Sequence, residues 1–191
     1  MTKKNSPIEK TTYVAFLRGI NVGGHHKVPM AELKKEMTKM GFTNVETLLN
    51  SGNVLFDSEE NRLMDLEKGI SDRLEKTFGF PIPTLIRNID LIHDLLNEDP
   101  FKNIVVTKDI RLYVSFLNID VKDPTPLPWS SEDGSYEILS RQDKTVLSVL
   151  DVSRSGTPQA MQALELFYGK DITTRNWNTI KRIEKKLGPR S

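Results

Sequence analysis

The sequence has no cysteine, which excludes disulfide bonds, thiolate metal sites and a cysteine nucleophile. It has three histidines, and the adjacent pair His25 and His26 would point in different directions on a helix or a strand, so we predict no metal site. No apolar run approaches the roughly 18 residues that span a bilayer, and the first residues lack the apolar core of a signal peptide. These absences favour a cytoplasmic protein with no membrane contact.

The chain also has almost no excess charge, since 27 lysines and arginines stand against 26 acidic residues for a net charge of +1. Long-range attraction of a polyanion must therefore come from a local patch. One candidate is the segment 175–190, in which six basic residues accompany the single acid Glu184. We interpret it as a solvated helix face whose cations suit the negative end of the helix dipole. Nucleic-acid binding through this basic C-terminal helix is the alternative, which the low net charge makes the weaker one.

The chain has 191 residues, of which 37% are apolar and 28% are charged, as in globular proteins with one domain or two small ones. Residues 1–11 contain too little apolar sequence to offset the cost of ordering, so we predict a disordered tail. We predict two α+β units after it. The first covers residues 12–100, and the second covers residues 101–191 and carries the C-terminal helices.

The first unit shows the pattern strand, helix, strand, strand, helix, strand. The strands are expected at Tyr13–Leu17, Val45–Leu49, Asn53–Phe56 and Pro83–Arg87. The first helix begins with Pro29 as its first residue and stops at Gly41. The second is capped by Ser58 and has one apolar face: Leu63, Leu66, Ile70 and Leu74. This order predicts an α+β fold of two ferredoxin-like (βαββαβ-type) units, the second less regular.

The second unit is preceded by a helix expected at Asn88–Asn97, and it contains an echo of the first unit. Tyr113–Leu117 repeats Tyr13–Leu17 almost letter for letter, which hints at an internal duplication. A long loop, Pro124–Ser135, stands where the first unit has a helix. The later elements are a hairpin of Tyr136–Ser140 and Val146–Leu150, a helix with Thr157 as cap and Pro158 as first residue, and a last helix beginning near its cap Thr174.

The stretch LRGINVGGHHKVPM, Leu17–Met30, is the best candidate for a site that holds an anion. Its glycines would let backbone N–H groups face a ligand, and the helix that follows would add positive charge at its start. In a ferredoxin-like sheet this loop and the turn 50–52 share one end. The candidate ligand-binding residues are Arg18, Gly19, Asn21, Gly23, Gly24 and Lys27 from the loop, with Asn50, Ser51 and Asn53 from the hairpin.

Other interpretations of this loop stay open. Its spacing fits neither the phosphate-loop nor the dinucleotide motif, and the glycines and asparagines could simply shape turns. An enzyme at the same site would use Ser51 with His25 or His26, but no reaction, catalytic residue or cofactor follows from the sequence. A further alternative is an interaction protein that docks through the proline-rich loop around Trp129. For the anion site we expect alanine at Arg18 and Asn21 to abolish binding with little change in melting temperature.

Three segments, YVAFLRGINVGGHHKVPMAELK, LLNSGNVLFDS and TTRNWNT, resemble the bacterial proteins grouped as domain of unknown function 1697. The resemblance implies a cytoplasmic α+β protein of ferredoxin-like units, with no established activity, substrate or cofactor. The sequence departs from the family pattern at Leu147–Gln159, where relatives have a Gly-Arg-Ser-Lys-like turn. TTRNWNT itself looks like a capped helix start, and it adds Arg175 and Asn178 as a second candidate anion site.

Overall fold

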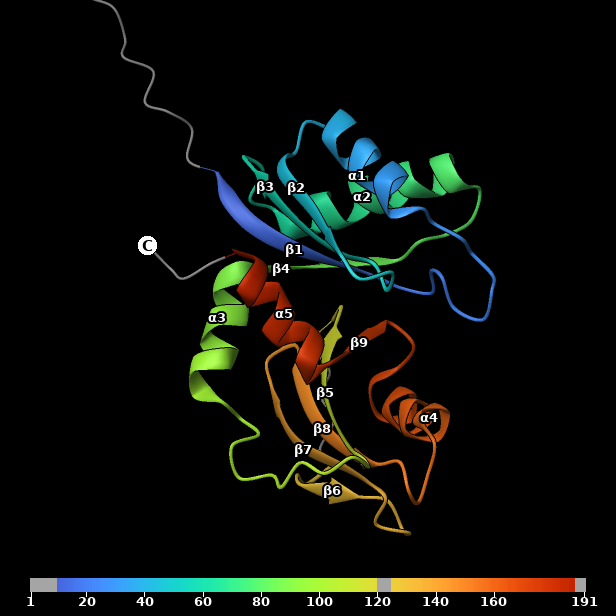
Figure 1. The fold of residues 1–191 in the computed structure, drawn as a ribbon, viewed down its shortest axis with the longest axis vertical. Coiled ribbons are helices and arrows are strands. Elements are labelled where there is room, and N and C mark those ends of the chain that lie inside the picture. Colours follow the sequence, from blue (N-terminus) through green and yellow to red (C-terminus); the bar gives the residue numbers. More distant parts are fainter. Residues whose placement is uncertain (1–9, 120–124, 188–191) are drawn as a thin grey trace, which may run out of the picture. The chain divides into compact units, whose positions relative to one another are not determined.

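The computed structural model describes residues 10–119 and 125–187 (Figure 1). Its contacts divide the chain into two compact units, Met1–Leu91 and Ile92–Ser191, so the division falls somewhat before residue 100. Each unit contains helices and one antiparallel sheet, which makes the protein α+β. Most of the predicted disordered tail lies outside the described residues, as does the start of the predicted long loop at Pro124.

The first unit follows the predicted order of elements. They are β1 (Thr11–Leu17), α1 (Met30–Lys39), β2 (Thr43–Leu48), β3 (Asn53–Ser58), α2 (Leu63–Phe78) and β4 (Thr84–Asn88). The sheet order is β2-β3-β1-β4 and every neighbouring pair is antiparallel. Because β1 and β2 both run opposite to β3, the segment that leaves β1 and the turn between β2 and β3 lie at the same end of the sheet.

The core of the first unit lies between this sheet and the helices α1 and α2, which cover one of its faces (Figure 1). Side chains alternate along β1, so Tyr13, Ala15 and Leu17 face this core. The helices contribute residues four positions apart, which lie on one face of a helix and form an apolar stripe. Those from α1 are Leu33 and Met37, and those from α2 are Leu66, Ile70 and Leu74.

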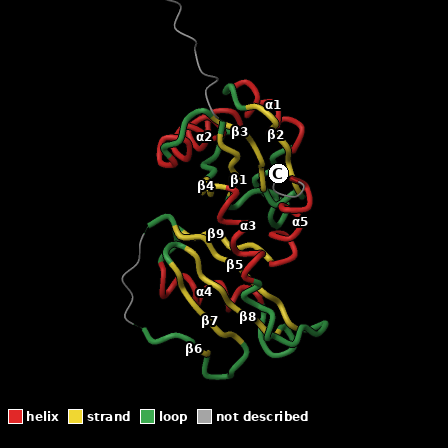
Figure 2. The backbone as a smooth tube through the Cα atoms, turned by 90° about the vertical axis from the view of Figure 1, so that its left-hand side faces the viewer, coloured by secondary structure: helices red, strands yellow, loops and turns green. Residues whose placement is uncertain are grey.

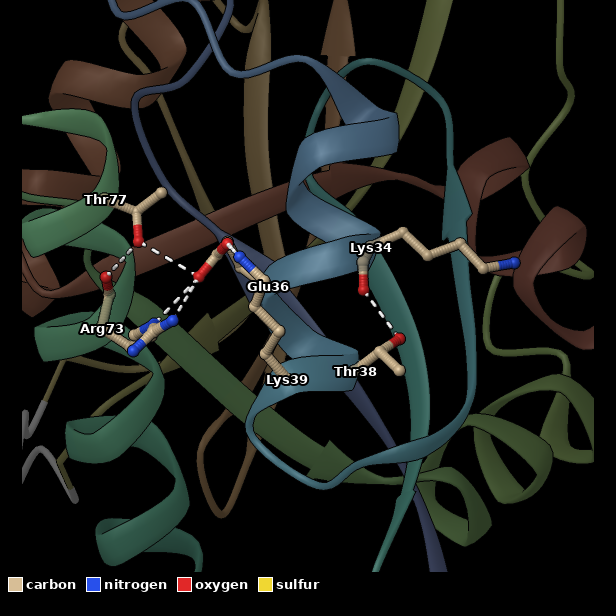
Figure 3. Close-up of polar contacts among 6 residues, drawn as sticks. All are labelled: Lys34, Glu36, Thr38, Lys39, Arg73 and Thr77. Atoms are coloured by element: carbon tan, nitrogen blue, oxygen red, sulfur yellow. Dashed lines mark hydrogen bonds and ion pairs between the residues drawn. The ribbon is translucent and has the colours of Figure 1, made fainter.

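A buried carboxylate also joins α1 to α2 (Figure 3). The Glu36 side chain is 6% exposed and accepts hydrogen bonds from Lys39 Nζ at 2.6 Å, and from Arg73 Nε at 2.9 Å and Nη2 at 2.6 Å. The hydrogen bonds from Lys39 and then from Arg73 lower the pKa of Glu36 to about 2. The carboxylate therefore stays ionised and paired with a cation from each helix.

Two predicted helix starts in the first unit were wrong. Pro29 is the N-cap of α1 and not its first residue, since its ψ of 127° is extended. Ser58 does not cap α2, because α2 begins at Leu63 and its N-cap is Arg62. The Ser58 hydroxyl instead accepts the backbone N–H of Glu60 at 3.1 Å and so closes a turn at the end of β3.

The second unit contains a five-stranded sheet in the order β6-β7-β8-β5-β9 (Figure 2). After α3 (Ile89–Glu98) the elements are β5 (Ile110–Leu117), β6 (Trp129–Ser130), β7 (Tyr136–Gln142), β8 (Thr145–Asp151), α4 (Thr157–Tyr168), β9 (Ile172–Asn176) and α5 (Trp177–Leu187). The helix α4 packs against the sheet through Ala160, Leu164 and Tyr168. Among the described residues no helix connects β5 to β7, in agreement with the loop predicted there.

The segment TTRNWNT was predicted as a capped helix start, and this was wrong. Thr173–Asn176 belongs to β9 and pairs with β5, with Thr173 opposite Phe116 and Asn176 opposite Tyr113. The helix α5 begins at Trp177, and the Asn176 side chain accepts the backbone N–H of Asn178 at 2.9 Å. Asn176 is therefore the cap in place of Thr174, because pairing with β5 already commits the preceding backbone to a strand.

The start of α4 also differs from its prediction by one residue. Gly156 is the N-cap, so Thr157 lies inside the helix and does not cap it. The Thr157 hydroxyl is 3.2 Å from the hydroxyl of Tyr113 and can hydrogen-bond with it. This threonine thus ties the first turn of α4 to β5.

The repeated strand sequence occupies the same place in both sheets. β1 lies between β3 and β4, and β5 lies between β8 and β9. The register agrees residue by residue, since Val14 pairs with Arg87 and Val114 pairs with Arg175. The backbone N–H of the last residue of each strand also bonds to the turn of the neighbouring hairpin at 2.8 Å. The two units therefore share one strand frame, although the segments between the strands differ.

The described part of the chain contains no helix with the length and apolarity that crossing a membrane requires.

Candidate functional site

The glycine-rich loop after β1 forms a small hairpin of its own. The backbone N–H of Asn21 bonds to the carbonyl of His26 at 3.0 Å, and that of His25 bonds to the carbonyl of Val22 at 3.1 Å. Gly23 and Gly24 form the two central residues, with φ values of 59° and 80°. Positive φ at both central positions defines a type I′ turn, which glycine enters without strain. These two glycines are therefore explained by the turn.

Asn21 fastens this small hairpin to the hairpin between β2 and β3. Its side-chain nitrogen donates to the carbonyl of Asn50 at 2.9 Å and to that of Val28 at 3.1 Å. Its side-chain oxygen accepts the backbone N–H of Val28 at 2.9 Å. Both ends of the amide are engaged, so Asn21 positions the loop and its replacement should lower stability. These contacts lead to a different expectation from the sequence, which predicted a nearly unchanged melting temperature for alanine at Asn21.

The turn between β2 and β3 is held just as closely. Asn53 is fully buried and donates to the carbonyl of Leu48 at 2.9 Å and to the Ser51 hydroxyl at 3.0 Å. Gly52 has a φ of 73°, and a β-carbon there would lie 2.7 Å from Ile20 Cδ1. The turn thus presses against the segment that leaves β1, and Gly52 and Asn53 form the frame of this end of the sheet.

An open hollow of about 420 Å³ lies where the two hairpins meet the start of α1. The eight described residues that line it are Asn21, Gly24, His25, Lys27, Val28, Pro29, Met30 and Asn50, and none of them is acidic. Lys27 supplies an exposed ammonium group and His25 an exposed imidazole. The first backbone N–H groups of a helix have no partner within it and give its start roughly half a positive charge. The lining of the hollow therefore brings a lysine, a histidine and a helix start together.

Several predicted residues lie near this hollow without lining it. Gly19 has a φ of 73°, and its carbonyl lies 3.2 Å from His26 Nδ1. The His26 ring also stacks on Phe80, with the ring centroids 4.4 Å apart. The half-buried Arg18 follows directly after β1, and its backbone N–H bonds to the carbonyl of Pro83 at 2.9 Å. Of the predicted set, Asn21, Gly24, Lys27 and Asn50 therefore line the hollow.

The sequence interpretation missed Pro29 and Met30 as site residues and considered His25 mainly as a partner for Ser51. Their place in the hollow follows from the turn at Gly23 and Gly24, which folds the loop back so that the start of α1 faces Asn50. The sequence did offer one indication, since His25, Pro29 and Met30 all lie within or directly after the glycine-rich stretch.

The second predicted anion site has a different character from the one expected. Arg175 is 9% exposed on β9, and its guanidinium donates to the carbonyl of Thr174 at 3.0 Å. Burial lowers the pKa of Arg175 to about 10. Arg87, the matching residue of the first unit, is 7% exposed and donates to the carbonyl of Ile86 at 2.8 Å. Both arginines thus bond to the backbone of the last strand of their sheet, while Asn178 is exposed on α5.

Within residues 10–119 and 125–187, no three histidine, aspartate or glutamate side chains are grouped as metal ligands would be.

Residues 10–146, more than half of the chain, match the family model described as "Protein of unknown function (DUF1697)". The chain belongs to the DUF1697 family. The matched region of this DUF1697 protein includes the glycine-rich loop, the β2–β3 hairpin and most of the second hairpin, which confirms the family resemblance of the sequence.

A solved structure of a conserved bacterial protein from Streptococcus pneumoniae has a similar fold, with a TM-score of 0.66 and 24% sequence identity. The similarity covers 94% of this chain and 100% of that one. At this identity the similarity supports the fold of the DUF1697 protein, and its chemistry has to be inferred from its own residues. No curated protein matches the chain.

Proposed function

We propose that this DUF1697 protein binds a small anionic ligand, phosphate-bearing or nucleotide-like, in the hollow between the 18–27 loop and the 50–53 hairpin. The observation that carries the proposal is the lining itself. Lys27 and His25 meet the start of α1 there, and none of the described lining residues is acidic in a chain with 26 acidic residues. An anion in this place meets positive charge or N–H dipoles and no carboxylate from the lining.

Each residue of the proposed site has a role that follows from its contacts. Lys27 supplies a mobile positive charge, the Asn50 side chain supplies an amide that fixes orientation, and Gly24 allows close approach to the backbone. Asn21, which also lines the hollow, and the buried Asn53 hold the two hairpins in place. Such rigid support lets a site bind without first ordering its loops.

Arg18 remains a predicted additional contact at the edge of this site. The pair Arg175 and Asn178 remains a separate prediction, confined to the second unit. A catalytic use of the same hollow, with Ser51 or a histidine in proton transfer, also remains a prediction, and the Ser51 hydroxyl already accepts a hydrogen bond from Asn53 at 3.0 Å.

An NMR titration of the full chain with inorganic phosphate and with adenosine monophosphate tests the proposal. We expect the amide signals of Gly24, Lys27 and Asn50 to shift as ligand is added. A charged hydrogen bond contributes about 1.5–3 kcal/mol, so Lys27→Ala should weaken binding by roughly tenfold or more. Lys35→Ala, which removes an exposed lysine of α1 that does not line the hollow, is the matched control. Titrations that shift none of these signals would refute the proposal.

We further infer that both units are variants of the ferredoxin-like fold and that the protein works in the cytoplasm. The strand order β2-β3-β1-β4 with two helices on one face supports the fold of the first unit. The shared register of β1 and β5 supports the same origin for the second unit. A reducing compartment is consistent with a chain that has no cysteine.

One surface supports nucleic-acid binding as a second candidate function. Lys181, Arg182 and Lys185 are exposed along one side of α5, whose opposite side is buried through Ile180 and Ile183. Side chains three and four positions apart lie side by side on a helix, so the three cations form a row. If all three contact phosphates of duplex DNA, the logarithm of the binding constant should fall against the logarithm of salt concentration with a slope near –2.7, at ~0.9 per contact. An anisotropy titration that shows no binding at low salt would exclude this function.

A further inference from the structure

We infer that the ligand of the proposed site carries a ring or a comparable apolar body beside its anionic group, the class to which nucleoside monophosphates belong. This inference rests on the proposed function and extends it from the charge of the ligand to its shape. It is carried by the size of the hollow, by the three consecutive apolar residues in its lining, and by the way Asn21 fixes the first of them.

The hollow is larger than a bare oxyanion needs. Its volume is about 420 Å³, whereas one water molecule takes about 30 Å³ of liquid, so a bound phosphate ion would leave most of the space to water. Pockets that hold organic ligands typically measure about 300–1,000 Å³. The volume therefore fits a guest with a body attached to its anionic group.

The lining offers a surface for such a body. The lining includes three consecutive apolar residues after Lys27, namely Val28, Pro29 and Met30, which we call the apolar wall, and it also includes the polar residues His25 and Asn50. Val28 itself is only 2% exposed. The Pro29 ring is exposed and Met30 is half-buried, so both present apolar surface that a guest can cover. A methionine sulfur makes favourable contacts with aromatic rings, and buried apolar area stabilises a complex. A purely inorganic anion would leave this wall uncovered.

The apolar wall is also held at a fixed position relative to Asn50. Asn21 bonds to both the N–H and the carbonyl of Val28, and the same side chain bonds to the carbonyl of Asn50. Beyond the wall, α1 is anchored by Leu33, which is fully buried. One side chain thus sets the distance between the apolar wall and the hairpin opposite, so a guest that fits both sides meets a preorganised site.

Three probes separate the contributions of ring and anion: adenosine monophosphate, ribose 5-phosphate and adenosine, each titrated into the full chain by NMR or calorimetry. We expect adenosine monophosphate to bind at least tenfold more tightly than either of the other two. Met30→Gln should weaken the binding of adenosine monophosphate severalfold and leave the affinity for ribose 5-phosphate unchanged. Met64→Gln is the matched control, since Met64 is a methionine of α2 that is 82% exposed. Because Met30 also packs against the core, Pro29→Ala serves as a second variant with the same expectation.

Each other outcome has a distinct meaning. Equal affinity for adenosine monophosphate and ribose 5-phosphate would overturn the inference of an apolar body and leave the proposed anion site standing. Adenosine binding as tightly as its monophosphate, with no effect of Lys27→Ala, would overturn the proposed anion site while the apolar wall still binds. Failure of all three probes to bind would overturn both. If Met30→Gln and Met64→Gln lower the affinity for adenosine monophosphate equally, the effect is one of general stability, and this result would also overturn the inference.

Discussion

Replacing Asn21 by alanine should destabilise the first unit and abolish ligand binding together. The change removes three hydrogen bonds of 2.9–3.1 Å that join the loop to Val28 and to Asn50. At about 1 kcal/mol net for each bond, this loss amounts to roughly 3 kcal/mol. Asn21 also has a φ of 56°, and alanine in this left-handed region costs about 1 kcal/mol more. We therefore expect the free energy of unfolding to fall by roughly 3–4 kcal/mol.

Urea unfolding followed by far-UV circular dichroism measures this loss, and two further variants divide it into its causes. Asn21→Gly loses the same hydrogen bonds without the backbone strain, so it should be about 1 kcal/mol more stable than Asn21→Ala. Asn21→Asp keeps an acceptor for the Val28 N–H but brings a carboxylate to two carbonyls. A loss below about 0.5 kcal/mol for Asn21→Ala would refute the clamping role, and equal stability of the alanine and glycine variants would refute the contribution from strain.

Three other substitutions test the frame of the first unit. Gly52→Ala places a β-carbon 2.7 Å from Ile20 Cδ1 at a φ of 73°, so thermal unfolding should show a loss of roughly 2–4 kcal/mol. Glu36 has its pKa lowered from 4.5 to about 2, so its contribution to stability is present above pH 4.5 and is lost as the pH falls toward 2. Urea unfolding between pH 5 and pH 2 should therefore show a steeper decline for the wild type than for Glu36→Gln. The Arg87 side chain is 9% exposed, and its Nη1 lies 3.7 Å from Glu67 Oε1. Glu67→Gln removes this countercharge, so chemical denaturation should show that the free energy of unfolding falls by about 3 kcal/mol.

The elements predicted correctly were those with a strong local signal. The continuous apolar run Tyr13–Leu17 indicated a buried strand, and the turn 50–52 indicated a hairpin, because apolar periodicity and turn residues act within a few positions. The proximity of the glycine-rich loop to that turn also followed from the sequence, since the order of strands and helices fixes which ends of the sheet meet. In this way the position of the candidate site could be inferred before its contacts were known.

The features that were missed depend on contacts between distant segments. β9 could not be recognised in ITTRN because its polar threonines are typical of a helix cap, and only pairing with β5 commits them to a strand. The sequence around Asn21 also does not indicate that its side-chain amide bonds to Asn50, which lies 29 residues later in the chain. Helix starts shifted by one or more residues for a related reason. Thr157, for example, is not the cap of α4, and its hydroxyl lies within hydrogen-bond distance of the Tyr113 hydroxyl. No local sequence pattern predicts this contact.

The matching register of β1 and β5 has a consequence for how new functions can arise in this family. β5 keeps its two neighbours although no glycine hairpin follows it in the sequence, so the strands do not require that particular connection. The strand scaffold and the glycine-rich loop are therefore separable parts. Transplanting Arg18–Val28 into the position after Leu117, or deleting its tip from the first unit, should therefore move or remove the proposed site while the strands around it stay in place.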